Sequence, residues 1–250
     1  MGTVVLGSGY VGRFLAALDP GAVHTSRQEA HVSGRLNWRR FDAADPATWG
    51  WLEGARPSGV IVSFPFHKGT DPAALAELLL RVSPRVVCIG STSAFSGGEV
   101  DDDSPVDPAD PRAAAEEVLR REGAVVLHAA GIYGPGRNPL DWVRRGLIGD
   151  GAKVVNLVHG EDVARACLFL LGRFTPGERL VISDGRPRCW SEIVAHAVGR
   201  GTLADPHLPE RGGVPSKRVV PRRLPALGFV PAHPDLLAEL DLLEGLPPAG

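Results

Sequence analysis

Glycines at positions 7, 9 and 12 constrain the fold of this chain more than any other feature. They follow an apolar run at residues 3–6, precede a helical pattern at 10–18, and are followed by a second apolar run at 22–24. In such a strand–loop–helix unit the first glycine allows a tight turn, the second lets a pyrophosphate approach the backbone, and the third lets helix and strand pack closely. The loop formed by Gly7, Ser8, Gly9, Tyr10, Val11 and Gly12 therefore predicts a dinucleotide site. A glycine-rich corner without a ligand is the alternative.

Apolar runs alternate with helical patterns along most of the chain, which is typical of a parallel sheet covered by helices on both faces. The clearest buried strands are expected at 59–64 and 86–89, with a helix over 72–82 between them. We therefore predict an α/β fold, a Rossmann-type doubly wound parallel sheet with a small C-terminal substrate lobe. Residues 1–172 are expected to form the dinucleotide-binding domain and residues 173–250 the smaller lobe, with strands and helices that interleave across this boundary as the alternative.

Two polar segments are predicted to lack regular structure. Residues 96–111 are rich in Gly, Pro and Asp and are expected to form a surface loop. Within that loop, the run Asp101-Asp102-Asp103 lacks the alternating ligand spacing of a calcium site and is predicted to be solvated. The Pro- and Arg-rich stretch 211–223 is expected to be a linker, with contact to an anionic substrate as the alternative.

The composition is that of a soluble globular protein, because 44% of residues are hydrophobic and 22% are charged. A net charge of −2 gives no reason to expect nucleic acid or a membrane as partner. Cys88, Cys167 and Cys189 are far apart and show no metal-ligand spacing, so no metal is predicted. Without a signal or membrane segment, the chain is expected to be cytoplasmic and to bind a small-molecule substrate; oligomeric state stays open, with a homodimer as one option.

The end of the second predicted strand bears on which dinucleotide binds. NAD-binding folds usually carry Asp or Glu there, to accept from the ribose 2′-hydroxyl. Here Ser26 can donate to a 2′-phosphate and Arg27 can pair with it, which favours NADP over NAD. A solvated Arg27 and a register shift that brings in Glu29 are the alternatives. Asp42, after the third strand, is expected either to accept from the adenine amino group or to be a turn residue.

Several segments, taken in order, resemble the atypical or extended short-chain dehydrogenase/reductase superfamily, especially its small NAD(P)-dependent sugar epimerase/dehydratase-like members. They are residues 7–12, 62–65, 89–97, 131–137 and 156–164, so that the resemblance covers about residues 3–185. It implies NAD(P)-linked hydride transfer, with Ser63 and Ser91 at the cofactor. It also places Thr92 where the family has the Ser or Thr that orients the substrate. Hydroxyls at such a turn can also simply cap it.

The chain departs from the family pattern on the next predicted helix. That helix should carry a Tyr-x-x-x-Lys pair for proton transfer, but residues 107–117 contain neither tyrosine nor lysine. Arg112 could supply the lysine's charge, but its pKa excludes it as a proton donor at neutral pH. Tyr10 lies inside the glycine loop, so Tyr133 is the candidate proton donor, with an aromatic wall of the pocket as the alternative.

Two functions from different classes remain. The first is an NADP-dependent oxidoreductase or epimerase/dehydratase-like enzyme, with an atypical active site, acting on a small carbonyl or hydroxyl compound. The second is a non-catalytic NADP-binding sensor or scaffold that kept the cofactor site after losing the Tyr/Lys pair. His159 and Asp162, which begin a later predicted helix, are expected to be structural.

Overall fold

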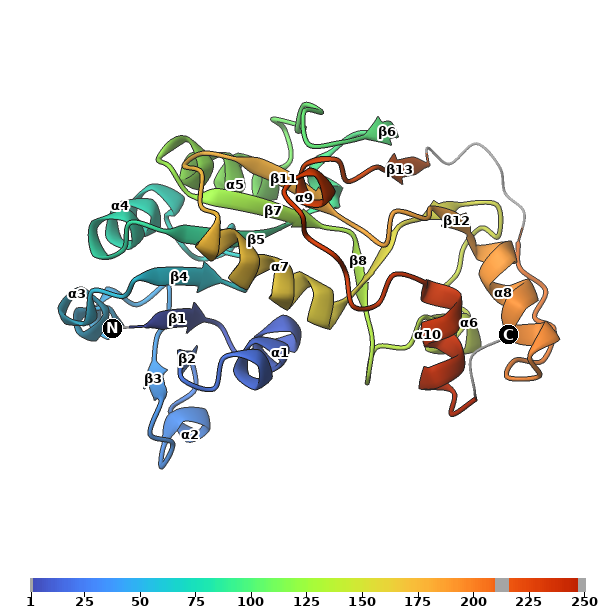
Figure 1. The fold of residues 1–250 in the computed structure, drawn as a ribbon, viewed down its shortest axis with the longest axis horizontal. Coiled ribbons are helices and arrows are strands. Elements are labelled where there is room, and N and C mark those ends of the chain that lie inside the picture. The colour runs from blue at the N-terminus through green and yellow to red at the C-terminus, as the bar shows by residue number, and fades with distance from the viewer. Residues whose placement is uncertain (1, 210–215, 247–250) are drawn as a thin grey trace.

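The computed structural model describes residues 2–209 and 216–246, and its centre is a seven-stranded sheet (Figure 1). The order of the strands is β11-β7-β5-β4-β1-β2-β3, and every neighbouring pair is parallel. The strands are β1 (Thr3–Leu6), β2 (Val23–Ser26), β3 (Trp38–Arg40), β4 (Gly59–Val62), β5 (Val86–Ser91), β7 (Val125–Ala129) and β11 (Arg179–Ile182). This confirms the predicted Rossmann-type doubly wound sheet. The order reverses between β1 and β4, where such sheets open a crevice at the carboxyl ends of their strands.

Helices cover both faces of the sheet. On one face lie α1 (Tyr10–Leu18) and α7 (Gly160–Gly172); on the other lie α3 (Gly50–Ala55), α4 (Pro72–Val82) and α5 (Pro111–Arg121). Successive side chains of a strand point to opposite faces. Accordingly, Val5 packs in the cluster shared with α1 and α7, whereas Val4 and Leu6 pack in the cluster shared with α3, α4 and α5. A short helix, α2 (Glu29–Val32), and the 3-10 turn η1 (Pro46–Thr48) complete this half of the molecule.

A second apolar core lies beyond the carboxyl ends of the strands. It is formed by α6 (Pro139–Arg144), α8 (Trp190–Gly199) and α10 (Leu236–Leu243), next to the pairs β8 (Gly131–Tyr133) with β10 (Leu157–His159) and β9 (Val154–Val155) with β12 (Arg188–Cys189). The division at residue 172 does not separate these two parts. β11 comes after residue 172 in the chain but lies in the main sheet. α6 and β9 come before residue 172 but lie in the lobe.

The polar segment 96–111 contains a strand. This strand, β6 (Gly98–Val100), follows the 3-10 turn η2 (Thr92–Ala94). It pairs in parallel with β13 (Lys217–Val219), which is followed along the chain by α9 (Arg223–Ala226). The predictions of an irregular loop at 96–111 and of a linker at 211–223 are therefore wrong for these strands, although residues 211–215 lie outside the described residues. Local composition did not reveal the strand, because its partner is more than a hundred residues away in the chain.

Asp102 is buried, which corrects the expectation of a fully solvated aspartate run. Only 3% of the residue is exposed. Its carboxylate accepts hydrogen bonds from the backbone N–H groups of Val181 (2.8 Å), Arg222 (3.0 Å) and Arg223 (2.9 Å). A single side chain thereby ties the segment after β6 to β11 and to the start of α9.

No helix in the described part of the chain combines the length and the apolar character needed to cross a bilayer.

Candidate functional site

The glycine loop joins β1 to α1 in a conformation that other residues could not adopt without strain. Gly7 has φ +102°, and its N–H donates to Thr25 Oγ1 at 3.0 Å. The Ser63 hydroxyl, at the end of β4, donates to the Gly7 carbonyl at 2.7 Å. A Cβ at Gly12 would lie 2.4 Å from that carbonyl, whereas a Cβ at Gly9 would meet nothing within 4 Å. The loop is thus closed against the sheet behind it and open in front, as a bound pyrophosphate requires.

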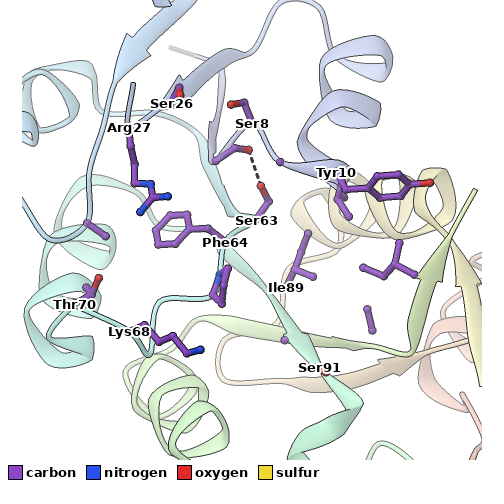
Figure 2. Close-up of a pocket in the computed structure, with 18 of the residues that line it drawn as sticks. Ser8, Tyr10, Ser26, Arg27, Ser63, Phe64, Lys68, Thr70, Ile89 and Ser91 are labelled. Carbon is purple, nitrogen blue, oxygen red and sulfur yellow. Dashed lines mark hydrogen bonds between the residues drawn. The ribbon is translucent and has the colours of Figure 1, made fainter. Parts of the chain in front are cut away.

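A cavity of about 910 Å³ lies over this loop, at the carboxyl ends of the central strands (Figure 2). Ten of the predicted site residues line it: Gly7, Ser8, Gly9, Tyr10, Val11, Ser26, Arg27, Asp42, Ser63 and Ser91. Gly12 lies behind the loop, against the Gly7 carbonyl. The described residues therefore fit a dinucleotide, because the glycine loop stands at the middle of one continuous cavity.

The end of β2 brings polar and basic groups into this cavity. Ser26 Oγ accepts from Gln28 N at 3.2 Å and lies 3.2 Å from His31 Nδ1, and Ser26, Arg27 and His31 all line the cavity. The Arg27 side chain makes no ion pair with any described residue. Glu29 begins α2 and does not line the cavity.

Asp42 lines the cavity after β3, and one of its carboxylate oxygens accepts from Ala44 N at 3.0 Å. This hydrogen bond closes a turn, which agrees with the alternative expectation that Asp42 is a turn residue. The second carboxylate oxygen has no hydrogen-bond partner among the described residues, so it is available to a ligand in the cavity. Both expectations for Asp42 are compatible with this position.

Several lining residues were missed by sequence reasoning. His31 and Gln28 follow the predicted Ser26-Arg27 pair, and Lys68 and Thr70 lie on the loop after β4. Lys68 had a usable signal, because it closely follows a buried strand whose carboxyl end faces the crevice. Figure 2 shows Arg27 and Lys68 reaching into the same cavity from the loops after β2 and β4.

The turn after β5 holds Ser91 and Thr92 in different positions. Ser91 lines the cavity, and its Oγ also accepts from Ser93 N at 3.2 Å. The Ser91 hydroxyl therefore caps η2, which agrees with the alternative that hydroxyls at this turn cap it. Thr92 is partly buried and does not line the cavity. Its carbonyl accepts from Lys217 Nζ at 2.7 Å, and the same amine donates to the Phe95 carbonyl at 2.6 Å. The turn is therefore fastened by a lysine from β13.

Tyr133 disagrees with its predicted place at the cavity. It is fully buried in the core of the C-terminal lobe, its ring centroid lies 5.4 Å from that of His159, and it does not line the cavity. Burial raises its pKa far above the ordinary value. Its hydroxyl has no hydrogen-bond partner among the described residues. Neither the proton-donor role nor the aromatic-wall alternative matches this position.

Tyr10, the other tyrosine, joins the glycine loop to the segment after β8. The guanidinium carbons of Arg13 and Arg137 lie 4.2 Å and 4.6 Å from the centre of its ring, and its hydroxyl donates to the Pro135 carbonyl at 3.3 Å. Arg137 lines the cavity as well. The lobe side of the cavity is thus held to the glycine loop by cation–π contacts.

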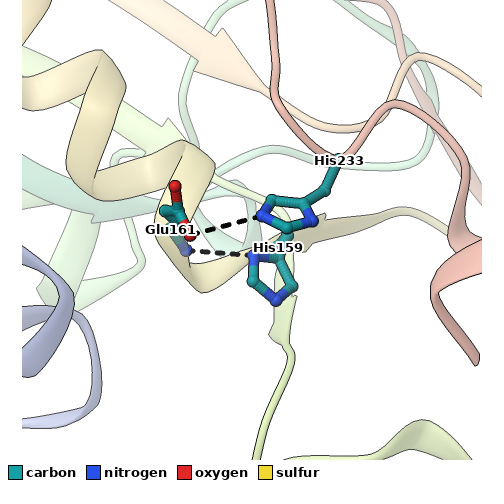
Figure 3. A group of neighbouring side chains, drawn as sticks. All are labelled: His159, Glu161 and His233. Carbon is teal, nitrogen blue, oxygen red and sulfur yellow. Dashed lines mark hydrogen bonds and ion pairs between the residues drawn. The ribbon is translucent and has the colours of Figure 1, made fainter. Parts of the chain in front are cut away.

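His159, Glu161 and His233 form a group outside the cavity (Figure 3). His159 caps α7 by accepting from Glu161 N at 3.3 Å; His233 Nε2 lies 3.4 Å from Glu161 Oε2, and His233 Nδ1 lies 3.0 Å from Glu239 Oε1. The two imidazole rings are 3.7 Å apart and tilted by 38°. The ligand atoms of the three residues lie within 4.8 Å of one another, but they already have protein partners: His159 Nδ1 accepts at the helix N-cap, and both nitrogens of His233 lie beside carboxylates. We interpret the group as an ion-paired contact between α7, α10 and the chain between them.

The two histidines of this group have opposite pKa shifts. Burial, together with the charge of His233, lowers the pKa of His159 to about 4. Burial also opposes the charge on His233, but hydrogen bonding to Glu239 and the nearby carboxylates outweigh it and raise its pKa. Asp162 accepts from the backbone N–H groups of Ala232 (2.6 Å) and His233 (3.0 Å). These contacts agree with the structural roles expected for His159 and Asp162.

No family model matches the sequence of this chain, and no curated protein matches it by sequence. Solved structures match it over nearly its whole length. A protein from Methylobacillus flagellatus assigned as an NAD-dependent epimerase/dehydratase is 22% identical, with a TM-score of 0.77 and 97% of both chains covered. The fold is that of the epimerase/dehydratase structures.

Two further structures with this epimerase/dehydratase fold were solved with nicotinamide dinucleotides. A dTDP-glucose 4,6-dehydratase from Bacillus anthracis in complex with NAD is 14% identical, with a TM-score of 0.79, covering 98% of this chain and 96% of that one. A human epimerase family protein with NADPH is 16% identical, with a TM-score of 0.72, covering 98% and 99%. Both nicotinamide dinucleotides therefore occur on this fold.

Proposed function

We propose that this chain is an NADP-dependent enzyme, an oxidoreductase or epimerase/dehydratase-like protein acting on a small carbonyl or hydroxyl compound. The observation that carries the proposal is the cavity over the glycine loop, with Ser26 and Arg27 at the end of β2 and no carboxylate lining it there. NADP carries a phosphate where NAD has a hydroxyl, and Arg27 is a cation suited to that phosphate. The nicotinamide dinucleotides bound to other proteins of this fold support the choice of ligand class.

The chain's own residues supply binding and orientation. The backbone of the glycine loop and the N-terminus of α1 favour the pyrophosphate, because unpaired N–H groups and the helix dipole attract anions. Ser63 holds the Gly7 carbonyl and so fixes the loop behind the ligand. The bound dinucleotide would supply the hydride chemistry. Ser91, which lines the cavity at the end of β5, would orient the substrate.

A non-catalytic NADP-binding protein is the second candidate. It is favoured by one observation: Tyr133 is buried away from the cavity, and Tyr10, which does line it, donates its hydroxyl to the Pro135 carbonyl. Neither tyrosine is thus placed as a free proton donor at the turn after β5.

Thermal unfolding with NADP, NADPH, NAD and NADH tests the ligand, because a ligand that binds only the native state raises the midpoint with its concentration. We expect NADP and NADPH to raise the unfolding midpoint more than NAD and NADH do.

Arg27→Ala should weaken NADPH binding about 10- to 100-fold, the usual contribution of a hydrogen bond to a charged group, and leave NADH binding unchanged. Arg39→Ala is the matched control, since Arg39 lies on neighbouring β3 and does not line the cavity. No midpoint shift with any of the four ligands would overturn the proposal.

Incubation with a panel of small aldehydes, ketones and alcohols separates enzyme from sensor when two readouts are combined. Nicotinamide absorbance reports net oxidation or reduction, and product analysis by NMR reports epimerisation or dehydration, which return the hydride and leave the absorbance unchanged. The enzyme proposal expects turnover with at least one compound and its reduction in Ser91→Ala, which removes the hydroxyl that lines the cavity after β5. Tight NADPH binding without turnover across the panel would instead favour the sensor.

A further inference from the structure

Beneath the end of β5 lies a cluster of charged groups that the dinucleotide-binding loop does not use. Arg112 and Glu116 are one turn apart on α5, and Arg112 Nε donates to Glu116 Oε1 at 2.7 Å. The Glu116 side chain is only 3% exposed, and its second oxygen lies 3.3 Å from Nδ1 of His128, a residue that is 2% exposed. A Cβ at Gly90 would approach His128 Nδ1 to 2.8 Å and Glu116 Oε2 to 3.0 Å. The cluster therefore lies directly under Gly90, at the floor of the cavity.

A carboxylate this deeply buried is costly unless a cation is fixed against it. Arg112 is that cation, and its bond through Nε leaves the two terminal guanidinium nitrogens without a hydrogen-bond partner among the described residues. Arg112 also lines the cavity, and its side chain is 29% exposed. Glu116 thus orients the guanidinium from below, while the terminal N–H groups remain available above.

The sheet order assigns this cluster to one end of the cavity. Ser26 and Asp42 follow β2 and β3, the glycine loop follows β1, and Ser91 follows β5 on the other side of β4. A dinucleotide held at its pyrophosphate by the loop, with its adenosine end at β2 and β3, has its nicotinamide end over β5. Arg112 therefore lies beside the reacting end, next to Ser91, and away from the groups assigned to the cofactor's phosphates.

The charge of the cavity as a whole favours an anion. Lys68 and Arg137 line the same cavity, and neither forms an ion pair with a described residue. Asp42, at the adenosine end, is the only carboxylate residue among those lining it. The two terminal nitrogens of a guanidinium match the two oxygens of a carboxylate in a bidentate pair.

We propose that Arg112, held by Glu116, binds the carboxylate of the substrate, so that the compound turned over beside Ser91 is a small oxo or hydroxy acid. This inference rests on the proposed function, because it names the substrate class of the same cavity. Arg112 orients the substrate and transfers no proton, since a guanidinium group stays protonated in proteins. Glu116 is a positioning residue, as it acts through Arg112.

Calorimetric titration tests the inference with oxamate, a small carboxylate, and with oxamide, its neutral analogue, on protein saturated with NADPH. We expect oxamate to bind and oxamide to bind at least about tenfold more weakly, because only oxamate offers a charge-assisted pair. Arg112→Gln should weaken oxamate binding about 10- to 100-fold and leave NADPH binding within about twofold. Arg112→Lys should fall between, since it keeps the charge but loses the planar fork.

Arg112→Gln leaves Glu116 unpaired and can unfold the protein. The double variant Arg112→Gln/Glu116→Gln removes both charges together and keeps a neutral hydrogen-bonding pair; it should lose oxamate binding and keep the fold. Arg121→Gln is the matched control, because Arg121 ends the same helix with its side chain 74% exposed and away from the cavity.

Unchanged oxamate binding in Arg112→Gln, or equal binding of oxamate and oxamide to the wild type, would overturn the inference. Equal loss of NADPH and oxamate in this variant would do the same, because it would assign Arg112 to the cofactor. If the wild type binds NADPH but not oxamate, the proposed function stands and the inference fails. If the wild type binds no dinucleotide, the proposed function fails, and titration of the free protein with oxamate still tests Arg112.

Discussion

Gly9 and Gly12 lie in the same loop, but a side chain would meet open space at Gly9 and backbone atoms at Gly12. Gly9 has open space in front of it and an ordinary negative φ of −68°, so alanine fits the free protein there. We expect Gly9→Ala to keep the wild-type unfolding midpoint but to weaken NADPH binding at least about tenfold, because the methyl group occupies the pyrophosphate's approach. Thermal unfolding with and without NADPH measures both effects.

Gly12→Ala is the matched variant at the back of the loop. Its Cβ would lie 2.4 Å from the Gly7 carbonyl, a backbone atom that Ser63 also holds. We expect a loss of stability of about 1–3 kcal/mol even without ligand, as for overpacked cores. A Gly12→Ala protein as stable as Gly9→Ala would contradict this account of the loop.

His159 makes the stability of the fold depend on pH. Its pKa is about 4 in the folded protein against an ordinary 6.5, so the unfolded chain takes up a proton that the folded protein refuses. The corresponding stability is fully present above about pH 6.5 and is lost as the pH falls toward 4, by an amount on the order of 1–3 kcal/mol. His233, whose pKa is raised, contributes in the opposite sense: its stabilisation is present below pH 6.5 and is lost as the pH rises.

Urea unfolding of the wild type and of His159→Asn from pH 7 to pH 4 isolates the His159 contribution. Asparagine retains a side-chain acceptor at the helix N-cap but has no titrating group. The variant's stability should fall less steeply with acidification than that of the wild type. Parallel curves for the two proteins would show that His159 is not the responsible group.

Residue-level prediction succeeded where the local sequence carried the reason. The glycine loop, Ser26, Arg27 and Asp42 could be placed at the cavity because each follows a strand whose end was visible in the sequence. Two features could not be predicted: the burial of Tyr133 and the hydrogen bond from Lys217 to the Thr92 carbonyl. Both depend on how the C-terminal lobe packs, and no short-range pattern reports that packing.

At the scale of elements, Asp102 holds the segment after β6 to β11 and to the start of α9. Removing this carboxylate leaves the N–H groups of Val181, Arg222 and Arg223 without their acceptor, and Val181 lies in the core. We expect Asp102→Ala to lower the free energy of unfolding by about 2–4 kcal/mol, since buried polar groups without partners cost about 1–3 kcal/mol each. Chemical denaturation measures the change.

Asp103→Ala is the control for that prediction. The side chain of Asp103 is 78% exposed and pairs with Arg223 at the surface. Such pairs contribute about 0–1 kcal/mol, so the substitution should change stability little. Equal effects of the two substitutions would mean that the bonds of Asp102 do not hold the segment.

Elements with their own periodicity and caps were predicted closely. The helix over 72–82 begins at Asp71, whose side chain accepts from Ala73 N, and has proline in its first turn. α10 (Leu236–Leu243) and β13 had no comparable signal; the first lies in a short leucine-rich stretch and the second in a Pro- and Arg-rich one. Strand pairing of β13 with β6 is a property of the assembled fold.

At the scale of the whole molecule, the chain returns to the main sheet after building part of the lobe. We therefore expect a fragment of residues 1–172 to lack a cooperative thermal transition by circular dichroism and to bind no NADPH. It leaves β7 without its neighbour β11, Asp102 without its three backbone donors, and the Thr92 carbonyl without Lys217. The full chain is the control. A fragment that unfolds cooperatively and gains stability from NADPH would establish 1–172 as an independent domain.

Lys217 also bears on when the protein matures. Its ammonium group fastens the turn after β5 through the carbonyls of Thr92 and Phe95, although it comes more than a hundred residues later in the chain. During synthesis, the N-terminal part of a chain leaves the ribosome first. On a ribosome, the glycine loop and β5 emerge early, but the turn after β5 is fastened only after residue 217 has been made. The cavity is therefore complete only once nearly the whole chain has been made, and premature termination before residue 217 would leave the turn after β5 unfastened.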